Sequence, residues 1–290
     1  MQVRAISWNL FHGRDFPPDP ALLTWRSRLL RIGERNATHV QVNRELMVEF
    51  ADLLAAAEWD VALLQECPPR FAAPLARACG AEAHRVLTSR NSLSPLRQLA
   101  ARLNPDLIAS GEGGANLTLV RGAFRCDLST YGVDKSHRKR RTAVTERRDL
   151  VIHGGPLERR AMAFTRTAGV CVANLHASAH RPDLAAADVL RAASAATEWA
   201  GEAPLLFGGD LNLRPDQSPA VFEELRERFG LAPPTAPNAI DHLLARNLEI
   251  VERPRRWPPE AREVRSDGLA LRLSDHAPVE AMFATHDARE

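Results

Sequence analysis

Apolar and polar positions along this chain follow two kinds of repeat. Several short apolar runs stop abruptly at a polar residue, a glycine or a proline, which is typical of buried β-strands. The run at 61–64 stops at Gln65, and the prolines that follow Cys67 end the strand and leave Glu66 at its tip. The run at 205–207 is expected to break at Gly208 and Gly209. The predicted strands cover residues 3–9, 61–64, 117–120, 150–152, 161–165, 170–176, 205–207, 240–245, 248–251 and 278–283.

Helical spacing of apolar residues appears in three places. Residues from about 20 to 57 are predicted to be helical with an interruption, and Leu46, Phe50 and Leu54 mark one face near its end. A second helix should begin at Pro182 and run to about residue 199, and a short one should lie near 221–228. Many strands with a few helices between them favour two packed sheets with helices outside. We find no repeat or flexible linker, so the sequence predicts a single domain over residues 1–290.

Composition narrows the class of protein without identifying it. The 290 residues are 45% hydrophobic and 26% charged, as in an ordinary globular protein, and the net charge of +2 makes no strong case for a nucleic-acid or membrane partner. Four widely spaced cysteines form no C-x-x-C pair, which argues against a zinc site or a disulfide framework. No apolar stretch is long enough to span a bilayer, and the N-terminus has no signal-peptide pattern. We therefore expect a cytoplasmic protein and a monomer.

Polar residues of catalytic types follow the predicted strands at six places. Taken one at a time, these residues are common in turns and caps, so each motif alone is a weak indication of function. The six segments are Ser7-Trp8-Asn9, Leu64-Gln65-Glu66, Asn174-Leu175-His176, Gly208-Gly209-Asp210-Leu211-Asn212, Ile240-Asp241-His242 and Ser274-Asp275-His276.

In this order the six motifs resemble the endonuclease/exonuclease/phosphatase superfamily, also called DNase-I-like. Its signature is W-N, Q-E, N-x-H, G-D-x-N, an Asp in an I-D-H or L-D-Y context and a terminal S-D-H, and every part is present between Trp8 and His276. The resemblance implies an α/β fold in the form of a four-layered sandwich, in which two packed mixed β-sheets are flanked by helices. It also implies hydrolysis of a phosphoester P–O bond.

The chemistry of a phosphodiester explains why a divalent metal is expected in the site. The substrate is anionic and repels hydroxide, so the site must offset charge and activate water. Oxygen ligands suit Mg²⁺, with Mn²⁺ as a substitute, whereas the absence of a Cys/His cluster makes Zn²⁺ the poorer choice. We expect Glu66 to be the principal metal ligand, with Asn9 and Asp275 completing the shell directly or through water.

The family resemblance also implies roles for the other polar residues. Asp210 would orient or deprotonate the attacking water, and Asn212 would help to hold the water or the phosphate. His276 would bond a non-bridging phosphate oxygen, with Asp241 as the carboxylate that fixes its tautomer and raises its pKa. His176 would stabilise the transition state or protonate the leaving oxygen.

Further assignments complete the predicted site. Asn174, in an N-x-H form that resembles the DNase and sphingomyelinase branches, is taken as a substrate contact. His12 could face the site, although a loop histidine without a role is an equal alternative. His242 should point away from the site by strand alternation.

Two basic segments bear on the substrate. Residues 135–141 would suit a polyphosphate backbone, or they form a solvated loop. Arg255, Arg256 and Trp257 could reach the rim of the site and contact substrate, or they form a Pro-rich surface loop around a packed Trp. The leading interpretation is an endonuclease or broad nuclease acting on DNA or RNA. The alternatives are a phosphatase or phospholipase-like enzyme and, from another class, a non-catalytic binding module.

Overall fold

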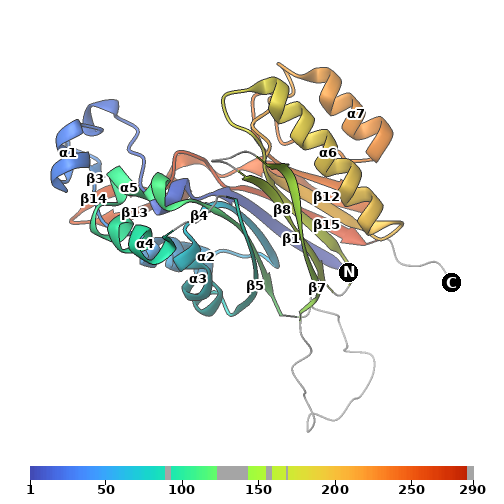
Figure 1. The fold of residues 1–290 in the computed structure, drawn as a ribbon, viewed down its shortest axis with the longest axis horizontal. Helices are drawn as coiled ribbons and strands as arrows, with labels where there is room; N and C mark the ends of the chain where they lie inside the picture. Colours follow the sequence, from blue (N-terminus) through green and yellow to red (C-terminus); the bar gives the residue numbers. More distant parts are fainter. Residues whose placement is uncertain (89–92, 123–142, 155–158, 168, 286–290) are drawn as a thin grey trace, which may run out of the picture.

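Two mixed β-sheets form the centre of the molecule. The computed structural model describes residues 1–88, 93–122, 143–154, 159–167 and 169–285 (Figure 1). The six-stranded sheet has the order β12 (Leu248–Arg256), β15 (Val279–Thr285), β1 (Gln2–Asn9), β4 (Val61–Cys67), β6 (Ala115–Arg121) and β5 (Ala81–Leu87). The five-stranded sheet has the order β11 (Asp241–Arg246), β10 (Leu205–Asp210), β9 (Cys171–His176), β8 (Arg159–Thr167) and β7 (Val144–Gly154). Only β1–β4 and β9–β10 are parallel pairs among these strands.

The two sheets pack face to face through alternate side chains of their strands. Val3 and Ala5 of β1 are buried against the other sheet in a cluster that also contains Val172 of β9 and Leu206 of β10. Trp8 points to the opposite face of β1, because successive side chains of a strand alternate. One strand therefore supplies both the core between the sheets and the core beneath the helices.

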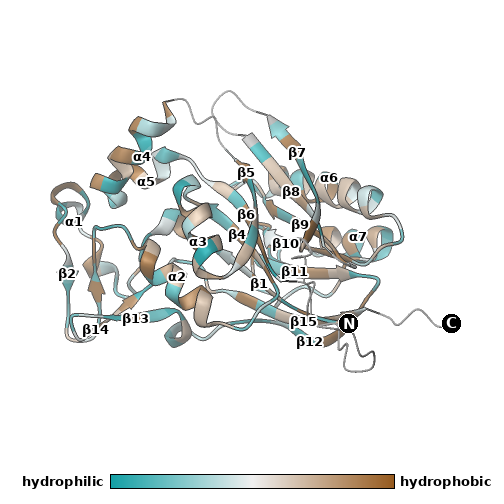
Figure 2. Ribbon diagram, turned by 90° about the horizontal axis from the view of Figure 1, so that it is seen from below, coloured by the Kyte–Doolittle hydropathy of each residue, from teal (hydrophilic) through white to brown (hydrophobic). Residues whose placement is uncertain are grey.

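Helices cover the outer face of each sheet. On the six-stranded sheet, α2 (Met47–Ala56) and α3 (Ala72–Ala78) bury Phe50 and Leu75. On the five-stranded sheet, α6 (Pro182–Ala200) and α7 (Pro219–Phe229) bury Val189 and Leu225 (Figure 2). The order helix, sheet, sheet, helix is the four-layered α/β sandwich predicted from the sequence, and the prediction is confirmed.

A side lobe stands at one end of this sandwich (Figure 1). It contains three short helices, in which α5 contacts both α1 and α4, and two small hairpin-like sheets. The elements are α1 (Trp25–Leu30), β2 (Glu34–Arg35), β3 (Val40–Gln41), α4 (Ser94–Leu103), α5 (Pro105–Glu112), β13 (Glu263–Ser266) and β14 (Leu269–Arg272). Short 3-10 turns lie between these elements: η1 (Phe11–Gly13), η2 (Pro20–Leu22), η3 (Pro69–Phe71) and η5 (Pro259–Arg262).

The predicted strands are all present, but two expectations need correction and several elements were not predicted. β10 does not break at the two glycines; it continues to Asp210. Glycine is required there because a Cβ on Gly209 would lie 1.9 Å from the carbonyl oxygen of Leu175 on β9. Residues 20–57 are not one interrupted helix, since only α1 and α2 are α-helical. The sequence also missed β5, α3, α4 and α5. No helix in the described ranges is long and apolar enough to cross a membrane.

Candidate active site

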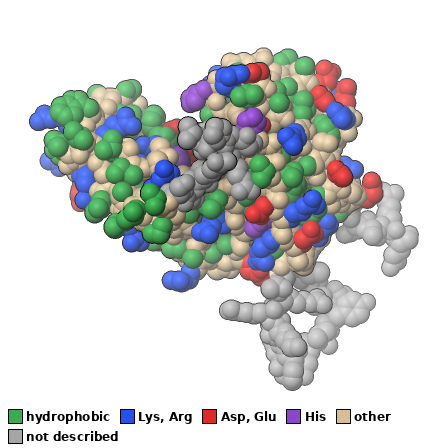
Figure 3. Space-filling model, viewed as in Figure 1, with side chains coloured by type: hydrophobic (Ala, Val, Ile, Leu, Met, Phe, Trp, Pro, Cys, Tyr) green, Lys and Arg blue, Asp and Glu red, His purple; other side chains and the backbone are tan. Residues whose placement is uncertain are grey.

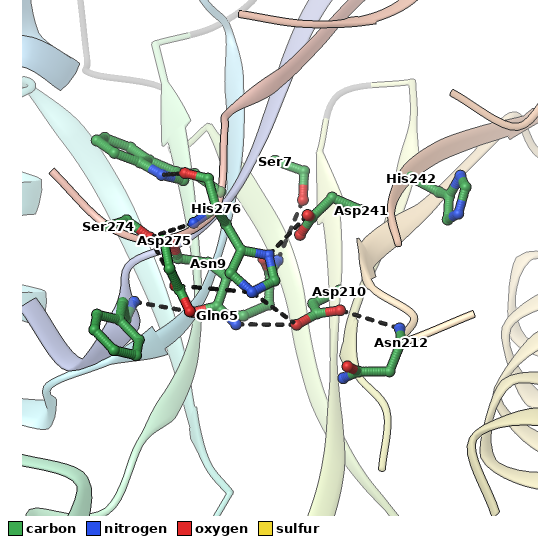
Figure 4. A network of polar contacts seen from close by, with 12 residues as sticks. Ser7, Asn9, Gln65, Asp210, Asn212, Asp241, His242, Ser274, Asp275 and His276 are labelled. Carbon is green, nitrogen blue, oxygen red and sulfur yellow. Dashed lines mark hydrogen bonds and ion pairs between the residues drawn. The ribbon is translucent and has the colours of Figure 1, made fainter. Parts of the chain in front are cut away.

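Five strands bring polar side chains to one edge of the sandwich. Asn9 ends β1 and Glu66 lies next to the end of β4, while His176 and Asp210 end β9 and β10. Because β1–β4 and β9–β10 are parallel pairs, each pair ends on the same side. β11 runs antiparallel to β10, so its first residue, Asp241, pairs with Asp210 at that same edge (Figure 4).

A loop between β14 and β15 closes the site from the side. Ser274 has a left-handed φ of 60°, and its hydroxyl donates to the carbonyl oxygen of Asn9 at 2.6 Å. The same hydroxyl accepts from the backbone N–H of His276 at 3.0 Å. The Arg262 guanidinium donates to the carbonyl oxygens of Ser274 and His276. These bonds fix the positions of Asp275 and His276 relative to β1.

His276 is held as a cation. Its Nδ1 lies 2.8 Å from Oδ2 of Asp241, and its Nε2 lies 3.9 Å from Oδ2 of Asp210 and 3.8 Å from Oδ1 of Asp275. Burial alone would lower the pKa of His276, but the Asp241 carboxylate, followed by Asp210 and Asp275, raises the pKa well above its usual value. An imidazolium with Nε2 left for substrate follows from this arrangement.

Asp210 lies at the centre of the group with 2% of its surface exposed. Its Oδ2 accepts from Nδ2 of Asn9 at 3.0 Å, and its Oδ1 accepts from the backbone N–H of Asn212 at 3.0 Å. Burial and the neighbouring Asp241 charge raise the pKa of Asp210 to about 7, although His276 and Asn9 act in the opposite direction. A carboxyl with such a pKa can accept and return a proton near neutrality.

His176 has the opposite charge state from His276. It is buried at the end of β9, and its Nε2 lies 3.5 Å from Oδ2 of Asp210 and 3.8 Å from Oε1 of Glu66. Burial lowers the pKa of His176 to about 3, because the attraction of Glu66 does not compensate for the lost solvation. The ring is therefore neutral and serves as a hydrogen-bonding group.

Glu66 projects from an irregularity in β4. Its φ is 46°, and the pairing of β4 with β6 shifts register between Leu64 and Cys67. Oε2 of Glu66 lies 3.1 Å from Nε2 of His12, in the turn just after Asn9. Burial would raise the pKa of Glu66, but His12, His176 and other polar neighbours lower it overall. The sequence left the role of His12 open, and the one signal for it was its position three residues after a strand-end Asn.

The oxygen donors of the site fit a hard divalent cation. Burial raises the pKa of Asp275 most, and repulsion from the Glu66 carboxylate raises it further. A cation bound by these carboxylates would relieve that repulsion. A second acidic group, Asp210, Asp241 and His276, has ligand atoms within 4.8 Å of one another. We interpret this second group as a set of ion pairs and not as a metal site, because the His276 imidazolium has no lone pair to offer a metal.

Asn9 lies in the site, but its side chain is already engaged. Its amide nitrogen donates to Asp210, and its oxygen accepts from the backbone N–H of Phe11 at 2.9 Å. It therefore orients Asp210, and its expected part in a metal shell stays a prediction. Asn212 donates from Nδ2 to the carbonyl oxygen of Ala177 at 3.2 Å and remains half-exposed beside Asp210.

The assignment of Asn174 as a substrate contact is wrong. This side chain has no exposed surface, and its Nδ2 donates to the carbonyl oxygens of Leu64 and Leu117 at 3.3 and 3.2 Å. Its oxygen accepts from Nε2 of Gln65 at 2.9 Å. Asn174 precedes His176 by two residues, so it points to the same side of β9 but deeper between the sheets. It joins the two sheets.

Arg255 and Trp257 have polar partners of their own, and their predicted contact with substrate stays a prediction. The Arg255 guanidinium forms an ion pair with Glu280, and Nε1 of Trp257 donates to Oε2 of Glu280 at 2.7 Å. Both side chains line a pocket with Leu53 of α2, on the helix-covered face of the six-stranded sheet. Arg256 instead donates to Oδ1 of Asn238 at 2.8 Å, and its predicted contact with substrate stays open.

His242 is turned out of the site, as strand alternation predicted (Figure 4). It is fully buried, with Nε2 3.1 Å from the carbonyl oxygen of Leu213 and Nδ1 accepting from the backbone N–H of Thr235. The basic segment at 135–141 lies outside the described residues.

Comparisons with known proteins agree with this architecture. A family model described as "Endonuclease/Exonuclease/phosphatase family" matches residues 6–276. No curated protein sequence matches the chain. Among solved structures, a family protein of Bacteroides thetaiotaomicron is 14% identical, with a TM-score of 0.61 over 100% of this chain and 97% of that one.

Two further structures are similar over almost their full length. A mannosyl-6-phosphatase of Bacteroides thetaiotaomicron is 13% identical, with a TM-score of 0.58 over 97% of this chain and 99% of that one. Truncated TDP2 of Caenorhabditis elegans is 16% identical, with a TM-score of 0.53 over 98% of each chain. At such low identity these similarities establish the fold, and they leave the substrate open.

Proposed function

We propose, from the premise that this chain belongs to the endonuclease/exonuclease/phosphatase family, that it is a divalent-metal-dependent phosphodiesterase. The observation that carries the proposal is the set of three charge states around one space: a cationic His276, a neutral His176, and Asp210 with a pKa of about 7. Phosphodiester hydrolysis needs a cation for the phosphate, a base for water and a donor for the developing charge.

Each of these side chains has a role in the proposed reaction. Nε2 of His276 would donate to a non-bridging phosphate oxygen, since Nδ1 is already bonded to Asp241. Asp210 would take a proton from the attacking water, and Asn212 would help to hold that water. His176 would donate a hydrogen bond to the developing charge, because its low pKa leaves no proton to give to the leaving oxygen.

Glu66 and Asp275 would hold the metal, for which Mg²⁺ is the first choice and Mn²⁺ the substitute. When bound, such a cation offsets the charge of the phosphate and lowers the pKa of coordinated water. His12 would keep the Glu66 carboxylate turned into the site through the 3.1 Å contact between Nε2 and Oε2. A binding module without catalysis is disfavoured, because no member of the group has been lost.

A polynucleotide is the first candidate substrate, and a phosphorylated small molecule or lipid is the second. The basic segment at 135–141 favours a polynucleotide substrate. Exposed apolar side chains and arginines on the side lobe favour the lipid alternative. The single domain over residues 1–290, the monomeric state and the cytoplasmic location stay predictions.

The test is a hydrolysis screen with Mg²⁺ and Mn²⁺ over plasmid DNA, RNA, a simple activated phosphodiester, phosphorylated inositols and phospholipids. Activity should vanish in excess chelator and return with metal. Arg228→Gln, on the surface of α7 where Arg228 pairs with Glu224, is the control and should keep full activity. Full activity in chelator would contradict the metal-dependent mechanism, and failure to cleave DNA or RNA would move the substrate to the small-molecule or lipid class.

The polynucleotide proposal has a second test in the basic segment. Neutralising Lys135, Arg138, Lys139, Arg140 and Arg141 together should raise KM for a long polynucleotide and flatten its salt dependence. Hydrolysis of a small activated phosphodiester should hardly change, because that substrate is too short to reach beyond the scissile phosphate. Unchanged salt dependence with intact nuclease activity would remove this segment from the substrate path.

A further inference from the structure

Exposed apolar side chains gather on the side lobe. Ten of the fourteen large hydrophobic residues that are exposed among the described residues belong to this one region, so their distribution is far from even (Figure 3). They are Leu23, Trp25, Leu29, Leu30, Ile32, Leu93, Leu96, Leu99, Leu103 and Leu107. Together they define what we call the lobe surface. An apolar surface of this kind usually marks an interaction site.

Helix α4 presents its apolar face outward. Leu96, Leu99 and Leu103 recur at helical spacing, yet all three are more than half exposed. The only buried residue of the helix is the small Ala101. No element of the described chain covers this leucine stripe. The helix is therefore amphipathic with its apolar side towards solvent, the reverse of a helix that packs on a core.

Hydrogen bonds connect the three helices that carry most of the lobe surface. Asn104, between α4 and α5, donates to the carbonyl oxygen of Leu29 at 3.4 Å and caps the N-terminus of α5 through Leu107. Asn43 donates to the carbonyl oxygen of Ser27 at 2.8 Å and to Oδ1 of Asn104 at 2.8 Å. These bonds join the end of α1 to the junction of α4 and α5, so the exposed leucines of the three helices lie on one surface.

Four arginines of the side lobe and α4 have no acidic partner among the described residues, whereas Arg102 of α4 pairs with Glu45. Arg26, Arg31, Arg35 and Arg97 are exposed, and none forms an ion pair with a carboxylate of the described residues. An apolar face flanked by arginines suits an anionic lipid surface, which accepts the leucines and attracts the cations. A second copy of the chain would oppose like charges, and a polynucleotide would leave the leucines unburied.

Hydrogen bonds connect α5 of the side lobe to the turn that follows β1. Arg14, which directly follows η1, donates to the carbonyl oxygen of Asp106 at 3.3 Å and to Oγ of Ser110 at 3.2 Å, both on α5. The chain then passes from α5 into Gly114, where a Cβ would lie 3.2 Å from Cα of Glu66. These contacts connect α5, which carries Leu107 of the lobe surface, to the backbone of the carboxylate that we assign to the metal.

We propose that the lobe surface docks this protein onto an anionic phospholipid membrane, with the leucines and Trp25 entering the interface and the arginines contacting lipid phosphates. Docking does not depend on which bond the protein cleaves. It can therefore be tested separately from the proposed phosphodiesterase activity.

Vesicle co-sedimentation tests the proposal with the full chain. The wild type should bind vesicles that contain phosphatidylglycerol more tightly than pure phosphatidylcholine vesicles, and salt should weaken this binding. The triple variant Leu96→Gln, Leu99→Gln, Leu103→Gln should bind at least about tenfold more weakly. The matched control changes Val151, Ile250 and Val251, exposed on β-strands elsewhere, to Gln and should bind as the wild type does. Circular dichroism would show that both variants are folded.

Trp25 offers a spectroscopic signature, since it is the one exposed residue among the five tryptophans of the chain. Its emission should shift to the blue when anionic vesicles are added. Trp25→Phe should abolish this shift and keep the binding. The proposal is overturned if the wild type does not bind anionic vesicles, if the leucine variant binds as well as the wild type, or if the leucines instead support a dimer that the triple variant loses.

Discussion

Replacing Asp210 with Asn should stabilise the fold at alkaline pH while it removes turnover. The Asp210 carboxylate is almost fully buried beside Asp241, so its ionised form is held in the folded protein at a cost. An amide of the same shape carries no charge and avoids that cost. Catalysis should nevertheless fall by at least ~10²-fold, the low end for removing a positioned general base.

The size of the expected stabilisation follows from the pKa of Asp210. Burial and the neighbouring charge raise the pKa of Asp210 from 3.8 to about 7, which at ~1.4 kcal/mol per pH unit corresponds to a ceiling of about 4 kcal/mol. The Asn variant loses about 1 kcal/mol of this gain, because its NH₂ group must face a donor from Asn9 or Asn212. The net stabilisation is then about 2–3 kcal/mol above neutral pH.

The sign of the pH dependence is fixed by the direction of the pKa change. A carboxyl with a raised folded-state pKa favours the folded state most below its unfolded pKa, near 4, and this contribution is lost as the pH rises to about 7. The stability difference between Asp210→Asn and the wild type should therefore grow from about zero or below at about pH 4 to its full value at about pH 8.

Urea unfolding in the presence of chelator measures this difference without a contribution from metal binding. Asp188→Asn is the matched control: Asp188 is similarly buried, accepts from the backbone N–H and the hydroxyl of Ser178, and lies outside the site. That variant should lose stability at both ends of the pH range. If Asp210→Asn is destabilised as much at about pH 8 as at about pH 5, the charge of Asp210 is not an appreciable cost to the fold.

Four other substitutions probe the metal ligand, the cationic histidine pair and the contact between the sheets. Glu66→Gln should weaken activation by Mg²⁺ in a metal titration and leave the melting temperature in chelator nearly unchanged; a wild-type metal response would reassign the ligand. Asp241→Asn removes the charge that raises the pKa of His276, so the basic limb of the kcat/KM profile should move to lower pH. Effects of Asp241→Asn and His276→Ala that simply add would show that the two do not act as a unit. Asn174→Ala should lower the free energy of unfolding by about 2–4 kcal/mol, because buried partners lose their bonds, and leave KM unchanged. A raised KM in a stable Asn174→Ala protein would restore the substrate-binding role.

The sequence could predict the strand-end residues because two local signals coincide there. A buried strand needs an apolar run, and the residue that leaves the sheet edge is free to be polar, so His176 and Asp210 stand out without a structure. β5 gave no such signal, since its sequence mixes Ala, Glu, His and Arg with little regular alternation. α4 has the pattern of an amphipathic helix, but the pattern alone cannot say whether its leucines face a core or solvent.

The side of the sheet on which Arg255 and Trp257 lie depends on the register of β12. β12 pairs with β15 through two register shifts, between Ile250 and Glu252 and between Glu252 and Arg255. Each irregularity changes which face a given residue takes, so the alternation of side chains along β12 could not be counted from its start. The error at Asn174 comes from its depth: the N-x-H motif fixes the side of β9, whereas depth between the sheets depends on where the partner strands end.

The two histidines show why residue types determine a site only in part. His176 and His276 both stand in motifs beside carboxylates, and the sequence left the task of His176 undecided between two roles. In the fold, His276 has a carboxylate oxygen at 2.8 Å, whereas the nearest carboxylate oxygen to His176 is at 3.5 Å. Burial therefore determines the charge state of His176, and the ion pair determines that of His276. The strand ends thus decide which chemical groups meet, and differences of less than an ångström between them decide which group carries a proton.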